Sequence, residues 1–161
     1  MTKRRIKDRA AFLQCEGDVW AELNAAVADI PPDMMLQPGV AGHWSLKDVL
    51  AHLAAWMEET LRVLPRLVEG EEVELGYTIE SFNARHYEAD RDRPLSAVQA
   101  RLERVRRELL ALLETVPEEL LLRHRRINEW AVYSTYGHYE EHLPDILRFK
   151  QGLEERDYEE R

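Results

Sequence analysis

The sequence predicts an all-α protein built as a four-helix bundle. Four segments have apolar residues spaced by three and four positions, as on one face of a helix, and no segment alternates apolar and polar residues as a strand does. A connection of about thirty residues between the second and third long helices indicates a crossover that carries a short extra helix. At this length the chain is expected to form a single domain, residues 1–161.

Prolines and a capping signal bound the first two long helices. The first is expected from Lys3 to Ile30, because Pro31-Pro32 cannot continue it. The second is expected to begin at Ser45, which with Asp48 three residues later resembles a capping box in its Asp form. Its apolar stripe continues to Pro65, where the proline should kink or end the helix.

The remaining helices follow within and after the crossover. A short helix is expected from Thr78 to Ala89, in a polar and aromatic stretch. The third long helix begins near Ser96, which with Gln99 gives another capping-box signal. A connection is expected from Pro117 to about Asn128, and the last long helix from near Trp130 to Glu155.

Composition argues against several classes of function. A formal net charge of −9 without a broad basic stripe argues against a nucleic-acid partner, whose binding depends largely on phosphate neutralisation. No apolar run is long enough to span a membrane, so no membrane partner is expected. Cys15 is the only cysteine and is expected to be an inert buried thiol, which favours a cytoplasmic location.

Three histidines lie on helical faces expected to point into the bundle. His138 and His142 occur in "GHYEEHLP", and a spacing of four residues places both side chains on one face of a helix. His52 lies on the apolar stripe of the second helix, from which a bundle could bring it to the pair. Three histidines with an open position are the arrangement of catalytic zinc. Spacing alone leaves open the alternative that all three are ordinary histidines.

The other three histidines are not expected to be ligands, and several further residues are expected to line a pocket. His43 and His124 are expected in loops or on the surface, while His86 could fold over the mouth of the bundle on its short helix. No nucleophile elbow and no phosphate-binding loop is found in the sequence. The expected pocket-lining residues are Trp56, Asn83, His86, Tyr136, Tyr139 and Glu141.

Three stretches resemble a known family. "HWSLKDVLAHLAAW" (His43 to Trp56) resembles the W-S-x-K-D-x-L-x-H-L-x-x-W signature of the DinB-like family, also called the DinB/YfiT superfamily. "YGHYEEHLPDI" (Tyr136 to Ile146) resembles the H-x-x-x-H motif of its last helix. "GYTIESFN" (Gly76 to Asn83) is similar to the ClbS-like (DUF1706/DfsB) branch. The resemblance spans nearly the whole chain.

The resemblance implies a four-helix bundle of up-up-down-down type, often dimeric, in which three histidines hold a divalent metal such as zinc or nickel. The matching positions are His52, His138 and His142. Members of the wider family include transferases and isomerases that use low-molecular-weight thiols. Some ClbS-like members lack the metal ligands and act as hydrolases that protect against a genotoxin.

The leading expectation is therefore a metal-dependent enzyme, a transferase or hydrolase, that acts on a small-molecule substrate, with a low-molecular-weight thiol as one candidate co-substrate. One alternative is a metal-free ClbS-like protein for small-molecule binding and self-protection. Another is a helical interaction module whose histidines fill the core. A homodimer is left open, because the apolar stripes could be buried within one chain or by a second bundle.

Overall fold

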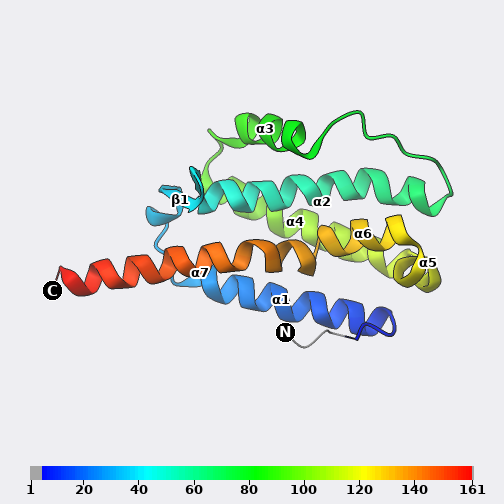
Figure 1. The fold of residues 1–161 in the computed structure, drawn as a ribbon, viewed down its shortest axis with the longest axis horizontal. Coiled ribbons are helices and arrows are strands. Elements are labelled where there is room, and N and C mark those ends of the chain that lie inside the picture. The colour runs from blue at the N-terminus through cyan, green and yellow to red at the C-terminus, as the bar shows by residue number, and fades with distance from the viewer. Residues whose placement is uncertain (1–4, 161) are drawn as a thin grey trace.

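The computed structural model describes residues 5–160 and consists mainly of long helices packed side by side (Figure 1). The long helices are α1 (Arg9–Ala28), α2 (Leu46–Val68), α4 (Leu95–Thr115) and α7 (Tyr136–Glu159). The short elements are η1 (Met34–Leu36), β1 (Pro38–Ala41), β2 (Trp44–Ser45), α3 (Ile79–Asp90), α5 (Glu118–Arg123) and α6 (Arg125–Tyr133). This confirms the predicted helical bundle and the crossover with its short helix.

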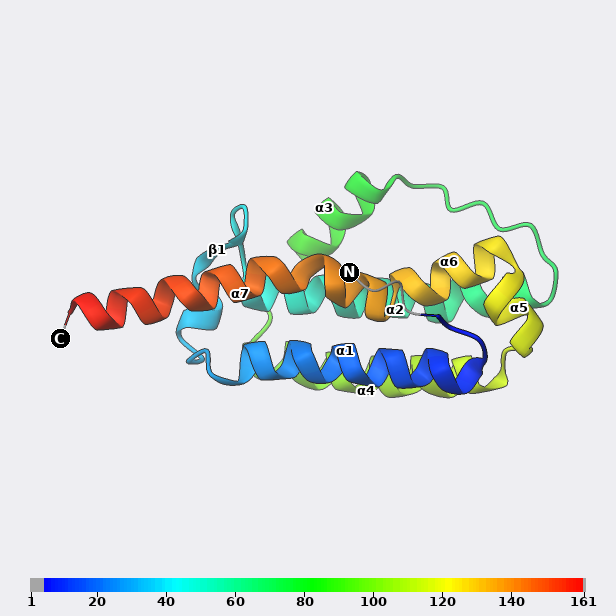
Figure 2. The same ribbon diagram turned by 60° about the horizontal axis from the view of Figure 1, so that its bottom comes forward.

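The order of the helix directions differs from the expected up-up-down-down type. α1 and α7 run in one direction, and α2 and α4 run in the other, which is an up-down-down-up order (Figures 1 and 2). α2 packs mainly against α4, and α1 packs mainly against α7. The connection after α1 is compact and ends at the same end of the bundle, so α2 must return antiparallel. Only the long crossover between α2 and α4 lets two successive long helices run in parallel.

Both ends of α2 follow from local chemistry. Ser45 and Asp48 form the predicted capping box: the Ser45 side chain accepts from the Asp48 N–H, and the Asp48 carboxylate accepts from the Ser45 N–H at 2.9 Å. At the other end the helix passes through Pro65 and stops at Val68, three residues beyond the predicted stop. The proline falls in the last turn, where the N–H of Glu69 still reaches its carbonyl at 3.1 Å.

The starts of the other long helices differ from the predictions. α1 begins at Arg9, after Asp8 caps it by accepting from the Ala11 N–H at 2.8 Å; the predicted start at Lys3 lies outside the described residues. α4 begins at Leu95 after Pro94, so Ser96 lies inside the helix and does not cap it. Proline suits this position because its ring fixes φ near the helical value.

The segment before α7 is helical rather than irregular. The connection predicted from Pro117 to Asn128 contains α5 and the first part of α6, and the last long helix begins at Tyr136 instead of near Trp130. The helix is interrupted between α6 and α7 at Ser134 and Thr135. Their hydroxyls donate to carbonyls of the preceding turn, at 2.5 and 2.6 Å. Such back-bonding ends or bends helices.

A small hairpin and a polar cluster complete the fold around α2. β1 and β2 pair antiparallel with Pro38 opposite Ser45, and Gly42 turns the chain with a φ of +60°. Two strands of this length are too short to show a period of two, which is why the sequence did not predict them. Where the crossover between α2 and α4 ends, Arg101 on α4 donates to Asp90 at the end of α3, at 2.9 Å, and to Glu58 on α2, at 2.7 Å. These ion pairs fix the end of α3 beside α2.

Two further findings concern the described residues as a whole. Cys15 is buried, as predicted. No helix among residues 5–160 combines the length and the apolar character that crossing a membrane requires.

Candidate metal centre

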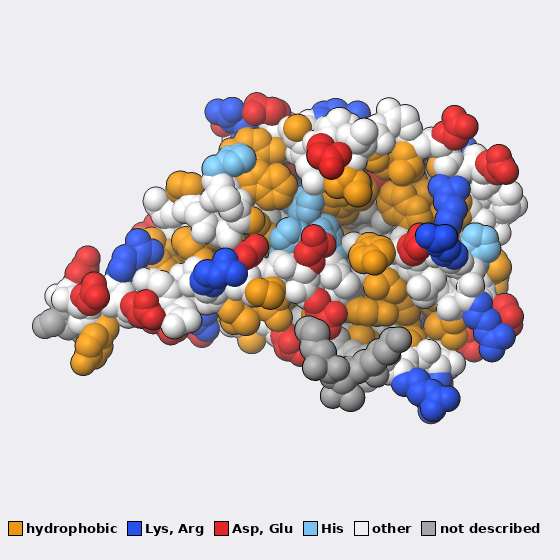
Figure 3. Space-filling model, viewed as in Figure 1, with side chains coloured by type: hydrophobic (Ala, Val, Ile, Leu, Met, Phe, Trp, Pro, Cys, Tyr) orange, Lys and Arg blue, Asp and Glu red, His pale blue; other side chains and the backbone are white. Residues whose placement is uncertain are grey.

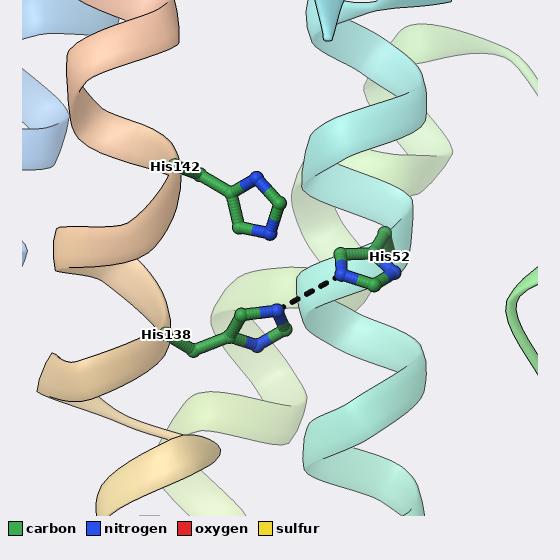
Figure 4. Close-up of side chains that lie close together, drawn as sticks. All are labelled: His52, His138 and His142. Atoms are coloured by element: carbon green, nitrogen blue, oxygen red, sulfur yellow. Dashed lines mark hydrogen bonds between the residues drawn. The ribbon is translucent and has the colours of Figure 1, made fainter. Parts of the chain in front are cut away.

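Three histidine side chains converge between α2 and α7. His52 projects from α2, and His138 and His142 project from successive turns of α7 (Figure 4). One ring nitrogen of each lies within 4.8 Å of one ring nitrogen of the others. The Nε2 atoms of His52 and His138 are 2.9 Å apart, so one donates and the other accepts, depending on the tautomers.

Gly137 positions the first turn of α7 directly against the end of α6. A Cβ atom at Gly137 would lie 2.8 Å from Val132 Cγ1 and 2.9 Å from the Val132 carbonyl oxygen, which is closer than real Cβ atoms approach such groups. Glycine is therefore required for this approach. This contact fixes the first turn of α7, which carries His138, against the end of α6.

The opposite face of α7 is held by a buried ion pair. Tyr139 is fully buried and donates from its hydroxyl to Glu16 on α1 at 3.1 Å. Arg106 on α4 donates to both oxygens of Glu16, at 2.8 and 2.7 Å, and stacks over the Trp20 ring. Since Tyr139 follows His138 directly, this cluster fixes the rotation of α7 and with it the direction of the imidazole.

Burial keeps the three histidines neutral. The pKa of His52 is lowered to about 3, mainly by desolvation of the buried ring and in smaller part by electrostatic repulsion from His142 and His86. Desolvation also brings the pKa of His138 well below its ordinary value and lowers that of His142. A neutral imidazole has a free lone pair, which is the form that binds metals. At neutral pH the three side chains are thus in their ligand form.

Two nitrogens of this group lack partners. His138 Nδ1 and His142 Nε2 are buried and form no hydrogen bond within residues 5–160. Leaving such a group unpaired costs about 1–3 kcal/mol. Tetrahedral zinc, with Zn–N distances of about 2.0–2.1 Å, would separate its nitrogens by roughly 3.3 Å. One pair of ring nitrogens, the Nε2 atoms of His52 and His138, is 2.9 Å apart, and one nitrogen of each of the three rings lies within 4.8 Å of the others, so small shifts would bring them to this spacing; three imidazoles suit zinc or nickel chemically.

A cavity of about 470 Å³ opens onto the histidines, with His52 and His138 in its wall. Figure 3 shows histidine side chains in a hollow near the middle of one face, bordered by hydrophobic side chains. Of the residues expected to line a pocket, Trp56, Asn83 and Glu141 do so. Trp56 Nε1 donates to Asn83 Oδ1 at 2.9 Å, which ties α3 to α2 over the site.

The other three expected pocket residues lie elsewhere. His86 borders a smaller space of about 10 Å³ beside His52, separate from the large cavity. Tyr136 and Tyr139 turn towards α1, where their rings pack against Phe12 and Trp20 with centroids 5.2 Å apart in both pairs. Side chains on a helix rotate by about 100° per residue, so neighbours of His138 at these spacings face away from α2. These placements differ from the sequence expectation.

Several lining residues were not anticipated. They are Tyr77, Arg126, Glu129, Trp130 and Tyr133. A signal was present, because Arg126, Trp130 and Tyr133 recur at spacings of four and three, as on one face of a helix. Arg126 was expected in the connection that ends near Asn128, whereas Trp130 and Tyr133 were expected in the last helix but were not assigned to the pocket.

Comparisons with known proteins agree on the fold. The model of the DinB superfamily matches residues 17–145. The colibactin self-resistance protein ClbS, solved in complex with a dsDNA, is similar with a TM-score of 0.76 at 16% identity, over 91% of this chain and 97% of that one. The sibling lethal factor precursor DfsB has a TM-score of 0.78 at 13% identity, over 92% and 98%.

A third solved structure gives the same result. An uncharacterised protein from Escherichia coli UTI89 has a TM-score of 0.76 at 13% identity, over 92% of this chain and 96% of that one. Among curated protein sequences, none matches the chain. At these identities the comparison shows that the fold is shared and shows nothing about function.

Proposed function

The chain belongs to the DinB superfamily, and on that premise we propose that it is a metal-dependent enzyme acting on a small molecule. The observation that carries the proposal is the convergence of three neutral histidines, with the buried His142 Nε2 unpartnered among residues 5–160, at the wall of a cavity of about 470 Å³. In this proposal His52, His138 and His142 are the ligands of zinc or nickel.

The roles of the chain's own residues follow from their places around the cavity. A bound divalent ion supplies a Lewis acid that lowers the pKa of a water or a thiol. That chemistry serves hydrolysis and thiol-dependent transfer alike, so a low-molecular-weight thiol is the co-substrate in the second case. Trp56 and Asn83 keep α3 over the site and limit the access of water, and Trp56 offers an apolar surface to the substrate.

The test is elemental analysis of protein purified without a histidine tag. About one zinc or nickel ion per chain is expected, and the His138→Ala/His142→Ala variant should contain none. The matched control is His43→Ala, because His43 is exposed and outside the cluster; it should keep the metal. Absence of metal from the unaltered protein after incubation with zinc and nickel would overturn the proposal.

A second candidate is a metal-free protein that binds a small molecule for self-protection. The likeness to the self-resistance protein ClbS and to DfsB supports it, with TM-scores of 0.76 and 0.78. The two candidates differ in one measurement. A ligand that binds only the folded state raises the melting temperature. Zinc or nickel should therefore raise it if the first proposal holds and leave it unchanged if the second does.

We propose no nucleic-acid partner for this chain, although ClbS was solved in complex with a dsDNA. A formal net charge of −9 opposes binding to a polyanion. The occupant of the cavity is then a small molecule in both candidate functions.

A further inference from the structure

The cavity beside the histidines has aromatic walls. Trp56 and Trp130 lie with ring centroids 6.2 Å apart, and Tyr77 lies 6.4 Å from Trp56 on another side. Tyr133 adds a fourth ring at the mouth, where 65% of it is exposed. Aromatic faces carry negative potential and attract organic cations as well as apolar groups.

The charged groups in the lining are mostly acidic. Glu141 lines the cavity near His138 and forms no hydrogen bond or ion pair within residues 5–160. Glu129 also lines it and accepts from the exposed Arg125 at 3.0 Å. Among residues 5–160, Arg126 is the one lysine or arginine in the lining, and it donates to the Val73 carbonyl at 2.9 Å. The lining thus has few positively charged groups that could bind an anionic ligand.

The segment that borders the cavity is acidic on its outer side. Residues 69–78 form a strap that leads from α2 to α3 (Figure 2). Leu75 and Tyr77 of the strap line the cavity, while Glu72 and Glu74 are exposed. Of the basic residues near the strap, Arg62 pairs with Glu59 and Arg66 with Glu71, at 3.0 and 2.8 Å, and Arg126 donates to the Val73 carbonyl at 2.9 Å. Unpaired carboxylates at a cavity mouth raise the local concentration of cations.

We propose that the ligand of this cavity is an organic cation: an amine or quaternary ammonium group on an apolar body. The aromatic rings and carboxylates receive the cationic end, and the remainder of the molecule extends towards His52 and His138. From His52 to Thr60, eight residues along α2, the wall is roughly 12 Å long, which suits a molecule with two separate functional ends. The placement of the reacting end beside His52 and His138 rests on the proposed function. The preference of the cavity for a cation does not.

The test compares three probes of nearly the same shape at pH 7: 2-phenylethylamine, 2-phenylethanol and phenylacetate. Binding is followed by NMR titration of the indole Nε1–H signals of Trp56 and Trp130, with Trp20, which packs in the core, as an internal reference. The amine should bind at least about fivefold more tightly than the alcohol, and phenylacetate more weakly than the alcohol. Titrations are run on full-length protein before and after chelation of metal.

Variants assign the preference to the cavity. Glu141→Gln and Tyr133→Leu should each lower the affinity for the amine several-fold and leave that for the alcohol nearly unchanged; both sites are exposed, so folding is preserved. Glu119→Gln is the control, because Glu119 lies on α5 outside the cavity and should change nothing. Equal binding of the three probes, tighter binding of phenylacetate, or no detectable binding of the amine would overturn the inference.

The outcomes separate this inference from the proposed function. An amine preference that persists in chelated protein, together with no metal by elemental analysis, supports the inference and removes the metalloenzyme. One metal ion per chain by elemental analysis, together with a preference for phenylacetate in chelated protein, supports the metalloenzyme and overturns the inference of a cationic ligand.

Discussion

Gly137 and Gly152 offer a matched pair of substitutions within one helix. Both lie in α7, but a Cβ atom at Gly137 would come within 2.8 Å of Val132 Cγ1 and 2.9 Å of its carbonyl oxygen, whereas nothing lies within 4 Å of one at Gly152. Gly137→Ala should therefore destabilise the protein by about 1–3 kcal/mol, as overpacking does. Gly152→Ala should stabilise it by about 0.5–1 kcal/mol, because alanine favours a helix.

The assay is urea unfolding followed by circular dichroism. With a slope of about 1–3 kcal/mol per molar urea, the two midpoints should differ by roughly 1 M, with Gly137→Ala the lower. Adding Val132→Ala removes the contact with Cγ1 but leaves the carbonyl oxygen, so it should restore only part of the loss. Since the first turn of α7 also directs His138, Gly137→Ala should weaken zinc binding too. Equal midpoints for the two glycine variants would refute this account of the close approach.

Three further predictions concern pH, the buried ion pair and nucleic acid. The pKa of His52 is lowered from 6.5 to about 3 in the folded protein, so its contribution to stability is complete above pH 6.5 and is lost as the pH falls towards 3, by up to about 1.4 kcal/mol per pH unit. Urea midpoints of metal-free protein should fall between pH 7 and 5, and less so in His52→Leu. Glu16→Gln removes the negative charge opposite Arg106 and one of the two acceptor oxygens, and should cost about 3 kcal/mol by the same assay, whereas the double change to leucine at both positions should cost less. No binding to a 20-base-pair dsDNA is expected by fluorescence anisotropy at 150 mM salt, and a micromolar affinity there would contradict the argument from charge.

Local signals predicted the starts of α2 and α3, although the capping signal of Ser96 with Gln99 failed because α4 already begins at Leu95. Ser45 with Asp48 starts α2 as expected, and Thr78 starts α3 with its own capping box, through Ser81. The direction of successive helices was not predictable in this way, because it depends on where each connection ends in space. The helix α5 and the first part of α6 were expected as a connection, since His124 separates the two helices and each is too short to show a sustained apolar stripe.

In the candidate site, too, the sequence predicted relations within one helix but did not predict which side chains share a pocket. A spacing of four fixed the relation of His138 to His142 from the sequence, and the apolar stripe of α2 placed His52 on the inner face. Tyr136 and Tyr139 were assigned to the pocket by closeness in sequence, but the rotation of the helix carries them to α1. Nearness along a helix is therefore a weak guide to a shared pocket, whereas a shared face is a good one.

The break between α6 and α7 separates the helix that carries His138 and His142 from the helix that carries aromatic residues of the cavity. If the two were one continuous helix, the side chains of Trp130 and Tyr133 would continue the face of α7 in fixed phase with His138. The hydroxyls of Ser134 and Thr135 end α6, and Gly137 lets α7 restart in contact with it, so the two helices take independent rotations. One rotation directs imidazoles at α2 while the other directs aromatic rings at the cavity.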